Sequence, residues 1–100
     1  MGKTSASGPP AKRGYPSVAS ATTTTLPDGA DVINITGTTT ITSVTASYAG
    51  RQVTLVFSGI LTFTDGSNLK LAGNFVTTAD DSITLVSDGT NWIEVARAVN

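Results

Sequence analysis

The sequence predicts an all-β fold built from short strands. Short apolar segments rich in Thr and Val recur along the chain, and Gly, Asn and Asp stand between them. Thr and Val are β-branched, and such side chains fit a pleated, half-buried surface better than a helix. Gly, Asn and Asp favour turns. Short strands with turns roughly every eight to twelve residues are typical of a sandwich, a barrel or a β-solenoid.

Composition limits both the size of the fold and its chemistry. The chain has 100 residues and contains neither Cys nor His. Disulfides, thiolate metal sites and the commonest general base are therefore absent, and we expect no enzymatic activity, no catalytic or metal site and no cofactor. A core of this size supplies only about 3–5 kcal/mol, so we expect oligomerisation to add stability.

Targeting signals are not evident either. No apolar run approaches the roughly 18 residues of a membrane span, and no apolar stretch follows Lys3 as a signal peptide would require. We expect a complete chain that begins at Met1 and has no membrane partner.

Residues 1–17 are expected to form an extended arm before a β domain that covers residues 18–100. Glycines make the segment pliable, and Pro9, Pro10 and Pro16 exclude a helix. Residues 1–16 carry three basic side chains and no acid, whereas the rest carries three basic and seven acidic ones. A basic arm on an acidic body suggests a negative or polar partner, although a solvated tail is the alternative. The proposed contact residues are Lys3, Pro9, Pro10, Lys12, Arg13 and Tyr15.

The charge of this arm is too small for a nucleic-acid partner. Three cations and one Tyr fall short of the basic, aromatic-lined surface that such proteins use.

The β domain is expected to begin with a Thr-rich lead-in over residues 18–26, which ends at the turn Pro27-Asp28-Gly29. Asp65-Gly66 and Asp88-Gly89 mark further turns. Residues 75–81 fit neither a strand nor a helix clearly. The remaining strands are expected at residues 32–36, 40–45, 52–57, 61–64, 69–71, 82–86 and 92–95.

Alternation along these strands predicts a narrow core. The outward positions carry Thr, Ser, Lys or Glu, and Thr rows suit contacts between identical subunits because their methyls pack while their hydroxyls pair. The predicted inward residues are Ile41, Val44, Val53, Leu55, Phe57, Leu61, Phe63, Leu69, Leu71, Ile83, Leu85, Ile93 and Val95.

Several polar or aromatic residues were considered as sites. The pair Asp80-Asp81 is expected to be a surface turn, because neighbours in a strand face opposite ways and no catalytic partner is evident. The aspartates at 28, 31 and 65 match no Ca²⁺ loop in their spacing.

Aromatic and basic side chains of the body allow two further expectations. Trp92 is expected to pack on the core beside the last strand, although it and Tyr48 could instead stack on sugars. Arg51 and Arg97 are expected to find acidic partners in neighbouring subunits.

An ordered series of motifs resembles a Thr-rich domain of tailed-bacteriophage virion proteins. This domain occurs in small decoration or head-fibre proteins and near the ends of tail fibres and tailspikes. The resemblance covers residues 18–98. Its motifs are Val18-Ala-Ser-Ala, Leu26-Pro-Asp-Gly, Val32-Ile-Asn-Ile-Thr-Gly-Thr-Thr-Thr-Ile-Thr-Ser-Val, Ala49-Gly-Arg-Gln-Val-Thr-Leu-Val-Phe, Asn68-Leu-Lys-Leu and Ser87-Asp-Gly-Thr-Asn-Trp-Ile-Glu-Val.

The resemblance implies a short-stranded, solenoid-like or intertwined homotrimeric β domain. Together with the arm, it leads us to expect a non-enzymatic structural protein of the virion: a capsid decoration, or cement, protein on the surface of the head. Its partners would be itself and the major capsid protein or another virion protein. The alternative is a trimerisation or host-glycan-binding domain at the end of a tail fibre or tailspike.

Overall fold

The computed structural model describes residues 15–100. These residues form ten strands and no helix, so the all-β prediction is confirmed. No helix capable of spanning a membrane occurs in this part of the chain.

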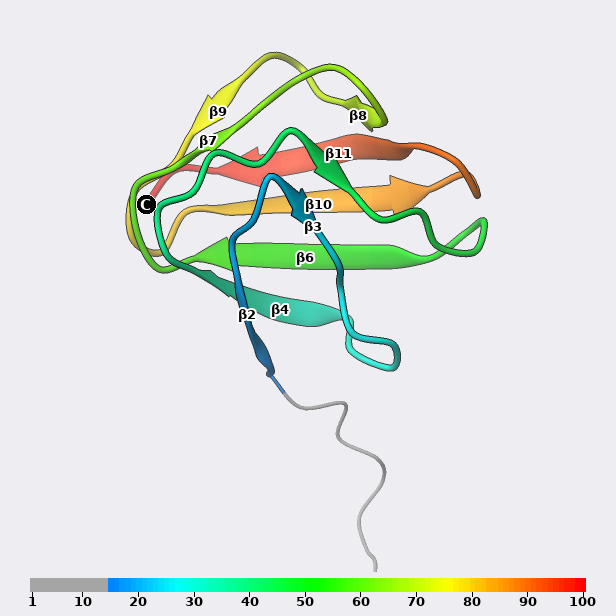
Figure 1. The fold of residues 1–100 in the computed structure, drawn as a ribbon, viewed down its shortest axis with the longest axis horizontal. Helices are drawn as coiled ribbons and strands as arrows, with labels where there is room; N and C mark the ends of the chain where they lie inside the picture. Colours follow the sequence, from blue (N-terminus) through cyan, green and yellow to red (C-terminus); the bar gives the residue numbers. More distant parts are fainter. Residues whose placement is uncertain (1–14) are drawn as a thin grey trace, which may run out of the picture.

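Six strands form one large sheet (Figure 1). In spatial order they are β2 (Ser17–Ala19), β4 (Val32–Thr36), β6 (Gln52–Phe57), β10 (Ser82–Ser87), β11 (Trp92–Ala98) and β8 (Leu69–Lys70). Two small sheets pair β3 (Thr23–Thr24) with β5 (Ser43–Val44) and β7 (Thr62–Phe63) with β9 (Phe75–Val76).

The two halves of the chain pair their strands differently. In the first half the pairing is parallel: Ser17 lies beside Asn34, Thr24 beside Val44, and Ile35 beside Phe57. In the second half β10 runs antiparallel to both β6 and β11, and β7 to β9, whereas the short edge strand β8 runs parallel to β11. The long β6 therefore joins a parallel stack to an antiparallel hairpin.

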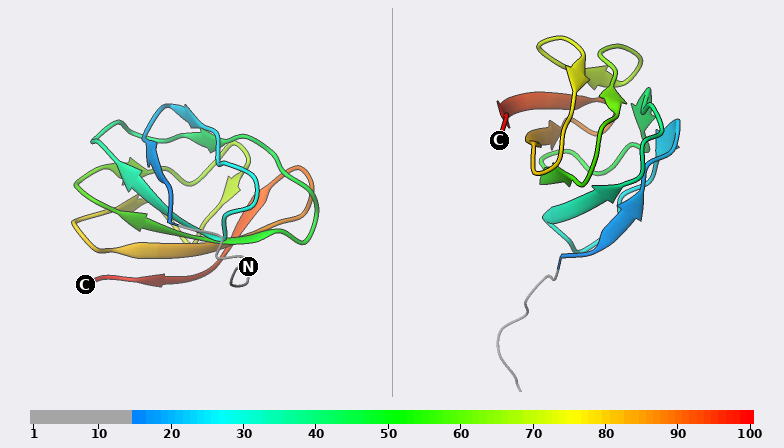
Figure 2. Two further views of the ribbon diagram at one scale, coloured as in Figure 1. Left: turned by 90° about the horizontal axis from the view of Figure 1, so that it is seen from below. Right: turned by 90° about the vertical axis from the view of Figure 1, so that its left-hand side faces the viewer.

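The core lies between the large sheet and the two small sheets. The small sheets cover one face of the large sheet (Figure 2). Strand alternation produces it, as in β6, where Val53, Leu55 and Phe57 are buried and the residues between them are more exposed. The ring of Phe57 contacts those of Phe63 and Phe75 with centroids 5.9 Å apart in each case. The other buried apolar residues are Leu26, Ala30, Ile33, Ile35, Ile41, Val44, Leu61, Leu69, Ile83, Leu85 and Trp92.

The inward prediction is wrong for two residues of the last strand. Ile93 and Val95 are 37% and 55% exposed, because Trp92 takes the core-facing position and reverses the alternation. The pairing with β10 then shifts between Thr84 and Leu85, which marks a β-bulge. Leu71 is partly buried at the edge of the core.

Several element boundaries also differ from expectation. The Thr-rich lead-in contains two short strands, β2 and β3, rather than one. β2 begins at Ser17, and the carbonyl of Pro16 accepts a hydrogen bond from the Asn34 amide. The segment with no clear prediction contains β9. Of the predicted arm, residues 1–14 lie outside the described residues.

Candidate functional site

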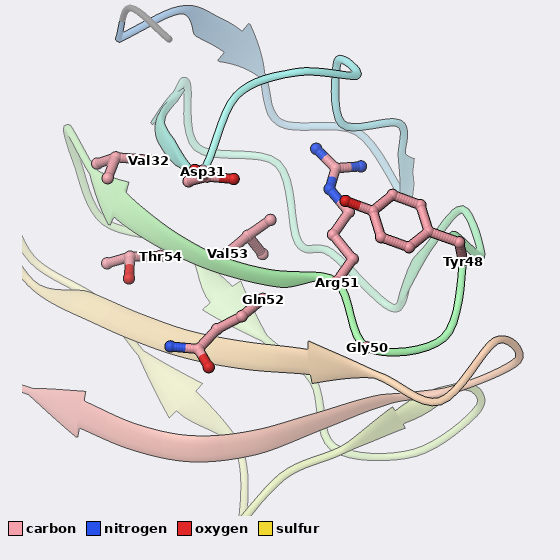
Figure 3. A pocket seen from close by; sticks show the side chains of 8 residues that line it. All are labelled: Asp31, Val32, Tyr48, Gly50, Arg51, Gln52, Val53 and Thr54. Carbon is pink, nitrogen blue, oxygen red and sulfur yellow. The ribbon is translucent and has the colours of Figure 1, made fainter. Parts of the chain in front are cut away.

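Two hollows lie near the turns that precede β4 and β6, and Arg51 lines both of them. The first has a volume of about 420 Å³ and the second about 350 Å³. The other residues of the first are Asp31, Val32, Tyr48, Gly50, Gln52, Val53 and Thr54 (Figure 3). Those of the second are Thr25, Leu26, Pro27, Asp28, Thr45, Ala46 and Ser47.

The Arg51 side chain is only 4% exposed and holds two turns together. Its Nη2 donates to the carbonyls of Pro27 at 2.6 Å and Ala30 at 3.1 Å, and Nη1 donates to Ser47 Oγ at 3.3 Å. The carboxylate of Asp28 lies 3.9 Å away but is fully exposed, so water screens this ion pair. Arg51 thus has partners within its own chain and a structural role there, while its expected pairing with a neighbouring subunit stays a prediction.

Tyr48 is the exposed aromatic residue of the first hollow. It lies on the loop before β6 (Figure 3), and 68% of its surface is exposed. An exposed aromatic face can stack on a sugar ring, and the same hollow holds the polar side chains of Gln52 and Thr54. The geometry is therefore compatible with the sugar contact considered from the sequence.

The Asp80-Asp81 pair is a structural turn. Asp80 has a positive φ of 72°, whereas the Asp81 side chain is buried, which a simple surface turn does not predict. Asp81 accepts hydrogen bonds from the amides of Asn100 at 2.7 Å and Thr78 at 2.8 Å, and from the Thr78 hydroxyl. These donors, the Asn100 amide first, lower the pKa of Asp81 and keep it ionised. Such a carboxylate is a poor general acid.

An ion pair lies where Ile93 and Val95 were expected to face the core. Glu94 and Arg97 form a bidentate pair, with distances of 2.7 and 2.8 Å. The hydrogen bond from Arg97 lowers the pKa of Glu94, and the same bond raises that of Arg97. The guanidinium carbon also lies 4.6 Å from the centroid of the Phe75 ring, and Nη2 donates to the Gly73 carbonyl at 2.9 Å. This cluster fastens β11 to the loop before β9.

Trp92 has the packing role that the sequence predicts. It is fully buried, and its indole Nε1 donates to the Thr45 carbonyl at 3.2 Å. The ring is thus unavailable to a ligand, and its only polar atom is satisfied.

The remaining predicted site residues are the six proposed contact residues of the arm, of which one lies in the described part of the chain. Tyr15 lies two residues before β2 and is 56% exposed, whereas Lys3, Pro9, Pro10, Lys12 and Arg13 lie outside the described residues. Within residues 15–100, no group of three or more acidic side chains is arranged to hold a metal ion.

The structural roles of Arg51 and Glu94 were not evident from the sequence. Glu94 and Arg97 are three residues apart, and in a regular strand such residues point to opposite faces. The bulge in β11 brings them to one side. The contacts of Arg51 depend on a turn more than twenty residues earlier, which no local pattern reveals.

No protein-family model matches the chain, and a search of curated proteins finds no match.

Proposed function

We propose that this protein is a non-enzymatic structural component of a tailed-phage virion. In the form we favour, it is a homotrimeric capsid decoration protein on the head, tethered by its N-terminal arm. The observation that carries the proposal is that the buried polar side chains of the described body serve to hold that body together.

Four of these side chains bond to backbone groups at least 18 residues away in the sequence. Arg51 joins two turns, and Asp81 binds the amide of the C-terminal residue. The fully buried Thr77 donates to the Gly59 carbonyl at 2.8 Å, and Ser87 donates to the Ser47 carbonyl at 3.1 Å. This use of polar groups supports a rigid, mechanical role.

Parallel stacking in the first half supports the solenoid-like form. The parallel partners there lie 17 to 22 residues apart, as in Ser17 with Asn34 and Ile35 with Phe57. A chain that returns to the same position at such intervals builds successive rungs, each of which buries its apolar face against the next.

The point at which the chain enters the body supports a tether. β2 is an edge strand of the large sheet, so the described chain enters the body at its rim (Figure 1). Three such arms on one trimer would bind a shell with high avidity, since the second and third attachments are intramolecular.

The experiment is co-sedimentation with purified heads that lack the protein, with tails as a parallel sample. We expect the full chain to sediment with heads, and Lys12→Glu with Arg13→Glu to weaken attachment more at low salt than at high salt, because salt screens exposed charges over about 10 Å at 0.1 M. Binding to tails and not to heads would contradict the head assignment.

The exposure of Tyr48 favours a second candidate: a trimerisation or host-glycan-binding domain at the end of a tail fibre or tailspike. Its test is binding to host surface glycans by the full chain, with Tyr48→Ala as the variant and Tyr15→Ala as the matched control. Loss of binding only in Tyr48→Ala would support this candidate.

A further inference from the structure

The outer face of the large sheet, which points away from the core, carries no charged side chain on its five neighbouring strands β2, β4, β6, β10 and β11. We call this surface the outer face. Alternation and register place on it Ser17, Ala19, Val32, Asn34, Thr36, Gln52, Thr54, Val56, Ser82, Thr84, Val86, Ile93, Val95, Ala96 and Ala98.

This composition is unusual for a sheet face in water. A solvated face of a sheet is normally polar, with Lys and Glu among its residues. Here Val32, Ile93 and Val95 are 41%, 37% and 55% exposed, and Val86 pairs with Ile93. The face therefore presents apolar side chains from both halves of the fold to the solvent.

The charges of the described body lie beside this face or away from it. Asp31 and Arg51 line the first hollow together with Val32, Gln52 and Thr54 of the outer face. Lys70, on the edge strand β8 beside Ile93, borders the outer face. Glu94 and Arg97 point the other way, toward the loop before β9. Most aspartates lie in turns, as Asp65, Asp80 and Asp88 do.

Several polar groups of the outer face already bond to one another. The hydroxyls of Thr54 and Thr84 lie 2.9 Å apart, across two central strands. Asn34 donates to Ser17 Oγ at 3.1 Å and accepts from Ser58 Oγ at 2.9 Å. Covering a polar group is costly mainly when it loses its partner, and these groups would keep theirs.

We infer that the outer face is the subunit interface, and that its occupant is a second copy of this chain. The inference rests on the proposed function for the number of copies, which is three. Identical faces without charge can meet without like-charge repulsion, and flat sheet faces pack about 10 Å apart with their side chains interdigitated. Each face meets two neighbours around a threefold axis, so the β4 side of one copy contacts the β11 side of the next.

Thiol labelling tests the position of the interface without adding charge. The chain has no cysteine, so Val95→Cys and Val76→Cys each introduce the only thiol. Val76 is the matched control, because it is 63% exposed on β9, outside the large sheet. We expect maleimide to label Val95→Cys at least about tenfold more slowly than Val76→Cys in native protein, and both at equal rates in denaturant. Equally fast native labelling in a trimer would overturn the inference.

Charge substitution then tests whether the face is required for assembly. Native mass measurement of the wild type should give close to three times 10.2 kDa. Val95→Glu should give a folded monomer by circular dichroism, whereas Val76→Glu should remain trimeric. If Val95→Glu stays trimeric, or if Val76→Glu alone dissociates, the outer face is not the interface and the proposed trimer still stands.

A monomeric wild type would be a different result. It would contradict the homotrimer of the proposed function as well as this inference. If Val95→Glu then abolished co-sedimentation with heads, the occupant of the outer face would be the shell and not a second copy.

Discussion

Residues 17–63 form the parallel stack and residues 82–98 form the antiparallel hairpin. Both bury apolar side chains in the core, but they pair their strands in different ways. In the hairpin, strand partners are close in sequence, and Asp88 closes the turn by accepting hydrogen bonds from the amides of Asn91 at 2.6 Å and Thr90 at 2.9 Å. In the stack, partners lie about twenty residues apart, as Thr24 and Val44 do. Local turn chemistry therefore organises the hairpin, whereas long-range side-chain contacts organise the stack.

The difference extends to how each region is fastened. Successive rungs of the stack are joined by hydroxyl pairs, such as Thr25 with Thr45, and by Arg51. The hairpin is instead joined to its neighbouring loop by Glu94 and Arg97, which bond to the Ala72 amide and the Gly73 carbonyl. Since distant contacts have a greater loop-closure cost, we expect the hairpin to form before the stack during folding.

The largest effect is expected where the two regions meet. Phe57 lies at the end of β6, which pairs with both β4 and β10, and its ring is fully buried. Phe57→Ala should lower the free energy of unfolding by about 3–5 kcal/mol, because it removes an aromatic ring and leaves a cavity. The stack and the hairpin should then unfold together.

The measurement is urea denaturation followed by Trp92 fluorescence, which reports on the core where the hairpin contacts residue 45 of the stack, and by far-ultraviolet circular dichroism, which reports on all strands. Two separate transitions would mean that β6 does not couple the regions.

A smaller effect, confined to the stack, is expected from Arg51→Met. The substitution keeps most of the apolar side chain but leaves the carbonyls of Pro27 and Ala30 without their donor, at a cost of about 1–3 kcal/mol. Amide exchange should rise around residues 27–33 and stay unchanged in residues 82–98. The control is Lys70→Met, an exposed cation on β8 that should change stability by less than about 0.5 kcal/mol. Uniform loss of protection would show that Arg51 does not act locally.

The buried residues of some strands could be predicted from the sequence, whereas those of the last strand could not. Alternation in residues 52–57 and 82–86 predicts the buried residues of β6 and β10, because regular strands repeat every two residues. The same rule places Ile93 and Val95 wrongly, because Trp92, the largest side chain of the core, occupies the inward position at the start of β11. A sequence pattern does not say which of two apolar neighbours will be buried.

Pairing between strands and the polar clusters were beyond sequence reasoning. The parallel partners of β2, β4 and β6 depend on how far each connecting loop travels, and no residue pattern specifies that distance. Likewise, neither the bulge beside Thr84 nor the contact of Arg97 with Phe75 follows from the spacing of the residues. The outer face also departs from expectation, because Thr, Ser, Lys or Glu was expected at outward positions, whereas Ile93 and Val95, predicted to point inward, lie on this face.

A pH-dependent effect is expected in the hairpin. Arg97 lowers the pKa of Glu94 in the folded protein, so the pair stabilises the fold above the ordinary pKa of a glutamate, about 4.3, and this contribution is lost as the pH falls through the lowered value. Glu94→Gln should cost about 0.5–1 kcal/mol at pH 7, because the partly exposed Arg97 is screened by water.

The measurement is urea denaturation of both proteins between pH 7 and pH 3. The difference between them should be constant down to about pH 5 and then shrink, since wild-type Glu94 becomes neutral only in acid. A difference that grows in acid would have the wrong sign for this pair.

The smallest effect is expected from the exposed hydroxyl pairs of the stack. Thr25 and Thr45 have their Oγ1 atoms 2.7 Å apart on the surface, so in Thr25→Val the remaining hydroxyl of Thr45 can bond to water. The substitution keeps the β-branched shape, and we expect a change of less than about 0.5 kcal/mol. Thr77→Val is the matched control: its hydroxyl is fully buried and bonds to the Gly59 carbonyl and the Leu61 amide, so its loss should cost about 1–3 kcal/mol. Equal costs in urea denaturation would mean that the surface pairs, and not only the buried contacts, hold the rungs together. That result would make the Thr-rich surface itself a source of the stack's rigidity.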